Sequence, residues 1–420
     1  MQFSGVAAFT TRQNKPSSSR PVLVVKFGGS VLTDEKNAKK AAEMLKRAYK
    51  RGFSLVVVVS ALKGVTDQLL NMTKATNPNV SDEMLAEVLS MGERTSARLM
   101  AATIEGVGLK AVFMDPTQEN WPIVSYGDYL NAEVDMEKTE KLVKEHVAPL
   151  LEQGYVPIVC GFIGRNTEGR IQTLGRGGSD TTAVVLGNAL RAKEVVLVKD
   201  VAGAFSADPK KAKDAKVVEE LDMEEALLLS VGGSKLIHSK AFKYLNDGIK
   251  LRITSLSHDI RGGTIIDGIM PQLEVDVSKE NISMITVVGR NLSTNGALAK
   301  IADAIRSSGG ILHSLSMDDR AIIAYVEGGS KVYDRIHEMA VKGGLGKATS
   351  FFEDLVEIKV RGKALEIAPG YIQKITVPLG RAGINIYGLV TIASSIRVYL
   401  AKNDAEKGLK LIKEALGLEG

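Results

Sequence analysis

The chain has 420 residues, of which 45% are hydrophobic and 25% charged, a composition typical of globular proteins and long enough for two or three domains. Its 54 basic and 49 acidic residues leave a net charge of +5 that is spread along the chain, which gives no support to nucleic-acid binding. Cys160 is the one cysteine, so we expect no intramolecular disulfide and no zinc cluster.

Residues 1–20 contain no apolar segment of useful length, so we expect a flexible tail and not a signal peptide. No stretch of 18 apolar residues occurs, so the sequence predicts no membrane span. From these two features we expect a cytoplasmic protein.

The segment 21–270 alternates short apolar runs with helical patterns. The runs are rich in valine, isoleucine and leucine without polar alternation, which is typical of parallel strands buried on both faces. They cover residues 21–25, 54–59, 110–114, 155–159, 194–198 and 251–255. Helical patterns between them include 39–50, 82–102 and 181–190. We predict a three-layer α/β domain with a mostly parallel sheet, whose ligands bind at the carboxyl ends of the strands.

The stretch "VVKFGGS" carries Lys26 at the end of the first predicted strand, followed by Gly28, Gly29 and Ser30. Glycines let backbone N–H groups approach a ligand closely, and the lysine adds a positive charge, so the stretch favours phosphate binding. A tight turn with a solvated lysine is the alternative. Ser60 ends the second strand in "VVVVSALKG", where small residues either admit a substrate or simply pack.

The stretch "SMGERTSARLM" places Glu93 inside a predicted helix, next to Arg94. Most pairs of this kind lie on a solvated helix face. Glu93 would have a functional role if a cationic group of a substrate had to be paired.

The stretch "TLGRGGSD" is the most specific one, because it joins a glycine-rich loop directly to a predicted helix. Its glycines free backbone amides at the helix start, where Ser179 or Asp180 can cap the helix. Arg176 offers a planar fork that suits a carboxylate, and Asp180, kept ionised by the helix end, can meet an ammonium group. The loop therefore offers partners for both charged ends of an amino acid, with an ordinary helix cap as the alternative.

The stretch "VKDVAGAFSADPKK" ends another predicted strand at Asp200 and continues with Phe205 and Lys210. An aromatic residue beside a basic one suits the base and the phosphates of a nucleotide. Lys235 in "VGGSKLIHS" again follows a glycine pair.

Beyond residue 270 the character of the sequence changes. The segment 267–277, "DGIMPQLEVDV", is predicted to be a linker, and an internal repeat with an offset of 74 residues follows it. The matched pairs are Gly296 and Gly370, Ile301 and Ile375, Ile305 and Leu379, Gly309 and Gly383, Leu312 and Ile386, and Tyr325 and Tyr399. Each copy is predicted to run strand, helix, strand, strand, helix, strand. Two unrelated α+β segments are the alternative.

Together these stretches resemble the aspartate kinases of the amino acid kinase family, and they occur in that family's order over residues 22–265. The repeat resembles the family's two regulatory ACT domains, which have an α+β ferredoxin-like fold. The resemblance implies a catalytic domain over 21–270 and ACT domains over 281–350 and 351–420. In three places the sequence departs from the family's pattern: Ser30 follows the glycine pair directly, without the usual threonine; Lys199 stands in place of a threonine; and Phe205 and Lys210 stand where tyrosine and arginine are common.

The family phosphorylates the side-chain carboxylate of L-aspartate with ATP and Mg²⁺, giving 4-phospho-L-aspartate, the first step toward lysine, threonine and methionine. By that resemblance the catalytic residues are Lys26 and Asp180. The residues implied to bind aspartate are Ser60, Glu93, Arg176, Ser179 and Asp180. The residues implied to bind the nucleotide are Lys26, Gly28, Gly29, Ser30, Asp200, Phe205, Lys210 and Lys235. We expect phosphate oxygens and waters to hold the metal, and assign it no protein ligand.

Chemistry agrees with this assignment. A carboxylate with a pKa of about 3.9 is already ionised at neutral pH, so no general base is needed, and catalysis would rest on positioning and positive charge. Two alternatives stay open. A sibling kinase for an acylated glutamate or an aminoadipate derivative is one, although an acylated substrate would leave Glu93 and Asp180 without an ammonium partner. A non-catalytic amino-acid sensor is the other, but it would have no need of Lys26 and Arg176.

Paired ACT domains usually associate between chains and bind amino acids at their interfaces. The resemblance therefore implies a homodimer or higher homo-oligomer, with lysine or threonine as the candidate effector. The candidate effector segments are 313–319 and the segment around Asn385. No nucleic-acid or membrane partner is expected.

Overall fold

The computed structural model describes residues 20–418 except 235, 247, 295 and 393. The chain divides into two compact units, with the boundary between Ile269 and Met270. The tail expected over residues 1–20 lies outside the described residues, apart from Arg20. In the described part of the chain, none of the helices combines the length and the apolar character that a membrane crossing requires.

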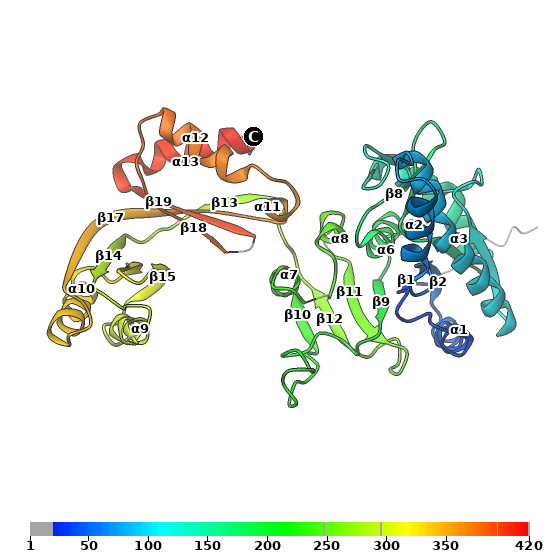
Figure 1. Ribbon diagram of the computed structural model, residues 1–420, viewed down its shortest axis with the longest axis horizontal. Helices are drawn as coiled ribbons and strands as arrows, with labels where there is room; N and C mark the ends of the chain where they lie inside the picture. The colour runs from blue at the N-terminus through cyan, green and yellow to red at the C-terminus, as the bar shows by residue number, and fades with distance from the viewer. Residues whose placement is uncertain (1–19, 235, 247, 295, 393, 419–420) are drawn as a thin grey trace, which may run out of the picture. The chain divides into compact units, whose positions relative to one another are not determined.

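The first unit is built on one eight-stranded sheet, in the order β10-β12-β11-β9-β1-β2-β6-β3 (Figure 1). The strands are β1 Val22–Phe27, β2 Ser54–Val59, β3 Lys110–Met114, β6 Tyr155–Cys160, β9 Glu194–Lys199, β10 Glu220–Asp222, β11 Lys250–Ser255 and β12 Thr264–Asp267. Neighbours pair in parallel except β11 and β12. All six predicted strands are present, and their apolar side chains are mostly buried, as expected for a sheet covered by helices.

Helices and short strands complete this unit. The helices are α1 Glu35–Lys50, α2 Val65–Thr76, α3 Asp82–Gly106, α4 Met136–Leu142, the π-helical turn η1 Val143–Val147, α5 Ala148–Glu152, α6 Gly178–Ala189, α7 Met223–Val231 and α8 Ser239–Lys243. Two small hairpins are formed by β4 Ser125–Tyr126 with β5 Glu133–Val134, and by β7 Ile163–Arg165 with β8 Ile171–Thr173.

Two of these helices position the candidate site. Helix α3 packs against β2, β3 and β6, and α6 packs against β1, β2 and β9. Ser81 caps α3 by accepting a hydrogen bond from the backbone N–H of Met84. Every residue of α6 is buried, so this helix is held on all sides and its first turn is fixed against the sheet.

The second unit holds a seven-stranded antiparallel sheet. Its strands are β13 Glu274–Val277, β14 Ile282–Val288, β15 Ile311–Met317, β16 Ala321–Glu327, β17 Ala348–Arg361, β18 Ile386–Ile392 and β19 Ser395–Ala401. They run in the order β15-β16-β14-β17-β19-β18, and β13 also pairs with β17. The helices are α9 Ala297–Ser307, α10 Gly329–His337, the π-helical turn η2 Glu338–Lys342, α11 Ala364–Ile367, α12 Tyr371–Arg381 and α13 Lys402–Leu416.

The internal repeat is visible in this unit. The first copy uses β14, α9, β15, β16, α10 and the start of β17, and the second uses the end of β17, α12, β18, β19 and α13 (Figure 1). Gly296 and Gly370 cap α9 and α12 with left-handed φ angles of 75° and 95°. The rings of Tyr325 and Tyr399 stack with centroids 3.8 Å apart. Matched positions in the two copies therefore have matched structural roles.

The linker prediction is wrong for part of its length. Residues Glu274–Val277 form β13, which pairs antiparallel with residues 358–361 of β17. Val275 packs against the core of the second copy. The sequence predicts that the last strand of the second copy follows its second helix. In the structure this strand is β13, which precedes the first copy in the chain. The expected boundary between residues 350 and 351 falls inside β17, which belongs to both copies.

Candidate active site

A pocket of about 420 Å³ opens in the first unit, where β1 and β2 end and α6 begins. This is the edge at which parallel sheets bind their ligands. The pocket brings together eight of the predicted site residues: Lys26, Gly29, Ser30, Ser60, Glu93, Arg176, Ser179 and Asp180.

The loop after β1 is held tightly by its own backbone. The N–H groups of Val31 and Leu32 both donate to the carbonyl of Gly28, and the N–H of Gly28 donates to Val198 on the neighbouring strand. A Cβ atom on Gly29 would lie 2.6 Å from the carbonyl oxygen of Ala61. A side chain at this position would therefore displace the loop that follows β2, which explains the need for glycine.

The charged centre of the pocket is the Asp180 carboxylate, which lies between two lysines. Lys26 Nζ is 2.7 Å from Asp180 Oδ1, and Lys199 Nζ is 3.3 Å from Asp180 Oδ2. All three side chains are at most 15% exposed. Burial by itself would raise the pKa of Asp180, but the two ammonium groups outweigh burial and lower this pKa to about 2. Asp180 is therefore ionised at neutral pH.

Glu93 contributes a second buried carboxyl group from the middle of α3. It is 3% exposed, and burial raises the pKa of Glu93 to about 7, against the opposing effects of a hydrogen bond with the Ala61 backbone and the charge of Lys26. Its Oε2 atom is buried and has no hydrogen-bond partner among the described residues. A buried carboxylate oxygen without a partner is costly, so this atom fits a cationic ligand group.

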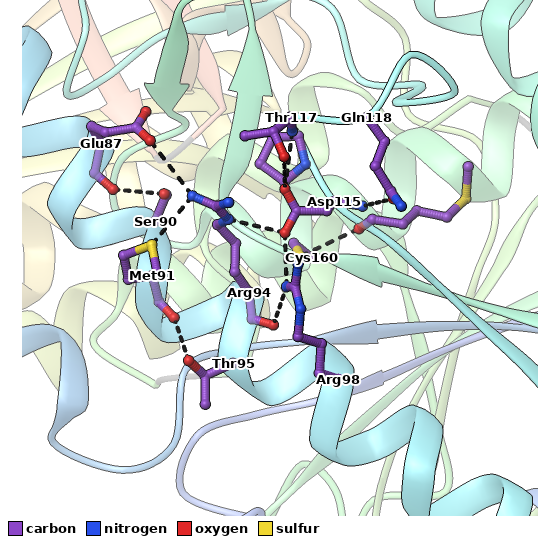
Figure 2. Close-up of polar contacts among 12 residues, drawn as sticks. Glu87, Ser90, Met91, Arg94, Thr95, Arg98, Asp115, Thr117, Gln118 and Cys160 are labelled. Carbon is purple, nitrogen blue, oxygen red and sulfur yellow. Dashed lines mark hydrogen bonds and ion pairs between the residues drawn. The ribbon is translucent and has the colours of Figure 1, made fainter.

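A cluster of ion pairs around the buried Asp115 holds the helix that carries Glu93 (Figure 2). Asp115, which directly follows β3, is fully buried and accepts hydrogen bonds from the backbone N–H and the hydroxyl of Thr117. Arg94 Nε lies 2.9 Å and Arg98 Nη1 2.7 Å from Asp115 Oδ2. Burial would raise the pKa of Asp115, but these partners lower it well below its usual range. The cluster ties α3 to β3 immediately beside Glu93.

The start of α6 forms another wall of the pocket. Gly177 caps the helix with a left-handed φ of 72°, and Ser179 and Asp180 are buried in the first turn. Arg176, just before the cap, is exposed and lines the pocket. Phe162 also lines it with a φ of 68°, which is unusual for a residue that is not glycine.

Sequence reasoning did not assign a role to several of these residues. In the sequence, Lys199 stands out only as a departure from a family pattern, and no motif points to Asp115 or Phe162. The glycine-rich stretch before α6 was a local signal, whereas the contacts of Lys199 and Asp115 join distant parts of the chain.

Only some of the residues expected to bind the nucleotide line this pocket. Gly28 lies beneath Lys26, since a Cβ atom there would be 3.6 Å from Lys26 Nζ. Asp200 and Lys210 are exposed, and Phe205 is half-buried in the loop after β9. These three do not line the pocket, and Lys235 lies outside the described residues. Their contacts with a nucleotide stay predictions.

The model of the amino acid kinase family matches residues 21–255, more than half of the chain. The chain belongs to this family. Over 95% of its length it is 29% identical to the aspartokinase of Corynebacterium glutamicum, of which the match covers 97%.

Two solved structures share the fold of this family member. The aspartate kinase from Synechocystis matches with a TM-score of 0.74 and 23% identity, over 94% of this chain and 70% of that one. E. coli aspartokinase III, solved with aspartate and ADP, matches with a TM-score of 0.54 and 21% identity, over 94% and 100% of the two chains. The predicted fold class, an amino acid kinase domain followed by two ACT-like domains, is confirmed.

Proposed function

We propose that the protein transfers a phosphoryl group from ATP to the side-chain carboxylate of L-aspartate, giving 4-phospho-L-aspartate. The observation that carries this proposal is the pocket itself. It places the paired Lys26 and Asp180, the unpartnered carboxylate oxygen of Glu93 and the exposed guanidinium of Arg176 around one space of about 420 Å³. The match to aspartokinases along nearly the whole chain supports the same activity.

The geometry suits an amino acid with a second carboxylate. Arg176 would hold the α-carboxylate through its planar fork, and Glu93 would hold the ammonium group. Asp180 was predicted to meet that ammonium group, but both of its oxygens already contact lysines. Its better-supported role is therefore to orient Lys26.

The chemical step requires positive charge and no base. The substrate carboxylate is ionised at neutral pH, so the obstacle is the repulsion between that anion and the phosphates of ATP. Lys26 and the N-terminus of α6 supply fixed positive charge at the point where negative charge develops. Ser60 and Ser179 line the same space and can donate hydrogen bonds to the substrate.

ATP would enter as its magnesium complex. The described residues include no cluster of three His, Cys, Asp or Glu side chains that could hold a metal ion. We expect phosphate oxygens and waters to be the ligands of the ion. Gly28, Gly29 and Ser30 are the predicted contacts of the phosphates nearest Lys26.

The second unit is proposed to regulate the first. Its tandem ACT-like fold supports amino-acid binding, with lysine or threonine as the candidate effector, and association into a homo-oligomer. These properties and a cytoplasmic location stay predictions. Thermal-shift measurements with lysine, threonine and methionine test the effector, because a ligand that binds the folded state raises the melting temperature.

Trapping of the acyl phosphate as a hydroxamate tests the substrate. We expect ATP-dependent hydroxamate with L-aspartate, and little with N-acetyl-L-glutamate, whose blocked amine cannot pair with Glu93. Turnover of another carboxylate in the absence of aspartate turnover would assign the protein to a sibling kinase activity. No turnover with any carboxylate would favour an amino-acid sensor.

Lys26→Ala tests the mechanism. Because Lys26 opposes the repulsion between two anions, its removal should lower kcat by about 10²- to 10³-fold, the usual cost of losing one preorganised charge donor. The fold should survive, since Lys199 still pairs with the Asp180 carboxylate in the variant. Lys50→Ala at the exposed end of α1 is the matched control. Near-normal turnover by Lys26→Ala would remove this lysine from the mechanism.

A further inference from the structure

Lys199 reaches Asp180 of the candidate site from the end of β9, the strand next to β1. β1 and β9 are parallel neighbours, with Lys26 opposite Leu197 and Phe27 opposite Val198. Lys199 is the next residue of β9, so the two lysines leave the same edge of the sheet on adjacent strands. Both ammonium groups converge on Asp180, one on each carboxylate oxygen.

Lys199 does not line the pocket, whereas Lys26 and Asp180 do. Its ammonium group therefore approaches Asp180 from outside the pocket wall. In this arrangement we expect no direct contact between Lys199 and a bound aspartate. Lys199 therefore acts on the reaction through its contact with Asp180 and through its charge.

The charge balance of the three groups shows what that effect is. A Lys26–Asp180 pair alone would be neutral, and the carboxylate would cancel most of the field that Lys26 directs into the pocket. With Lys199 bound to the second oxygen, the three side chains together carry one net positive charge, which the nearby carboxylates of Glu93 and Asp200 oppose only in part because they contact neither Asp180 oxygen. The three side chains are at most 15% exposed, so the surrounding solvent screens this charge only weakly.

We infer that Lys199 is a positioning residue that fixes Asp180 and leaves Lys26 with an uncancelled positive charge for the transferred phosphoryl group. The inference rests on the proposed function, since it concerns the same step. Burial lowers the pKa of Lys199, and the Asp180 carboxylate opposes that shift. The three side chains together favour the binding of a polyphosphate next to Lys26.

A purely structural role is the competing explanation. Lys199 would then serve only to satisfy a buried carboxylate, and its loss would lower stability without a selective effect on kcat. The two explanations differ in what Lys199→Arg should do. Arginine keeps the positive charge and can still bond to Asp180, whereas threonine removes the charge and leaves the Lys26–Asp180 pair in place.

Steady-state kinetics of Lys199→Thr and Lys199→Arg with ATP and aspartate test the inference. We expect kcat of the threonine variant to fall about 10- to 100-fold, less than the loss of a donor that touches the phosphoryl group. The KM for aspartate should stay within about twofold, because Lys199 lies outside the pocket. The arginine variant should recover most of kcat. Lys193→Thr, at an exposed position just before β9, is the matched control.

A second readout requires no aspartate. Calorimetry should show that inorganic tripolyphosphate binds Lys199→Thr about three- to tenfold more weakly than wild type, since one charge near the phosphates is lost. If wild type does not phosphorylate aspartate, the proposed function fails, and this binding measurement alone decides the inference.

Three results would overturn the inference. The first is a kcat of Lys199→Thr within about twofold of wild type. The second is an equal loss of kcat in the threonine and arginine variants together with a lower melting temperature, which would show a structural role. The third is an unchanged affinity of Lys199→Thr for tripolyphosphate.

Discussion

The replacement Glu93→Gln should stabilise the protein at alkaline pH while weakening its substrate site. Burial raises the pKa of Glu93 from 4.5 to about 7. Each pH unit between these values corresponds to 1.36 kcal/mol, so the ionised carboxylate costs the folded state about 3 kcal/mol. Because the pKa is raised in the folded state, the cost is absent below pH 4.5, grows between pH 4.5 and 7, and is complete above pH 7.

The sign and size of this free-energy cost can be measured in the full-length protein with a signal that comes only from the first unit. Trp121 is the one tryptophan of the chain, is 1% exposed and lies in that unit, so its fluorescence follows unfolding of the unit that carries Glu93. Urea titrations at pH 5 and pH 8 should show Glu93→Gln gaining up to about 3 kcal/mol at pH 8 and much less at pH 5. Glu105→Gln, at an exposed position of the same helix, should show neither effect.

The same variant should lose affinity for aspartate. Pairing of the substrate ammonium with an ionised carboxylate is worth about 1.5–3 kcal/mol, so KM should rise about 10- to 100-fold in Glu93→Gln. In wild type, KM should also rise as the pH falls below 7, because protonation of Glu93 removes its charge. A variant that is destabilised at pH 8, or that shows the same stability difference at both pH values, would refute the reasoning.

Two further changes concern ion pairs elsewhere. Asp115→Asn should cost about 3 kcal/mol at pH 7, because Arg98 loses its carboxylate partner and Arg94 keeps only the longer contact with Glu87. The difference from wild type should shrink as the pH falls below 4, where Asp115 of the unfolded chain becomes protonated while that of the folded protein, whose pKa is lower, is still ionised; urea titration followed by Trp121 checks this. His313 has a raised pKa, chiefly through its hydrogen bond to Glu357, so its contribution is present below pH 6.5 and lost as the pH rises. His313→Gln should therefore remove the pH dependence of the protection factors in β15, which are exchange rates corrected for the intrinsic pH dependence of amide exchange.

The parts of the molecule that were predictable are those encoded in short stretches of sequence. Continuous valine runs identified β1, β2 and β9, and the join between glycines and a helical pattern identified the start of α6. The pocket followed from these, because parallel strands end at one edge. The burial of Glu93 was not predictable, since a glutamate beside an arginine more often lies on a solvated face.

The unpredicted parts depend on contacts between distant residues. Arg94 and Asp115 are 21 residues apart, and whether they meet depends on how α3 crosses β3. Lys199 and Asp180 meet because β9 lies next to β1 and α6 packs on both. β13 has only four residues, and it forms a strand because it pairs with residues of β17 that come more than 80 positions later in the chain. No local pattern contains that information.

The order in which β13 and its partner are synthesised has a consequence for biogenesis. A ribosome releases Glu274 long before Arg361, its counterpart in β17, which lies 87 residues downstream. The first copy cannot close much earlier, because residues 348–355 of β17 supply its last strand. Nascent chains that stop short of residue 361 therefore expose incomplete sheet edges, which are sites for aggregation and chaperone binding. The second unit should acquire its structure late, after nearly the whole polypeptide has been made.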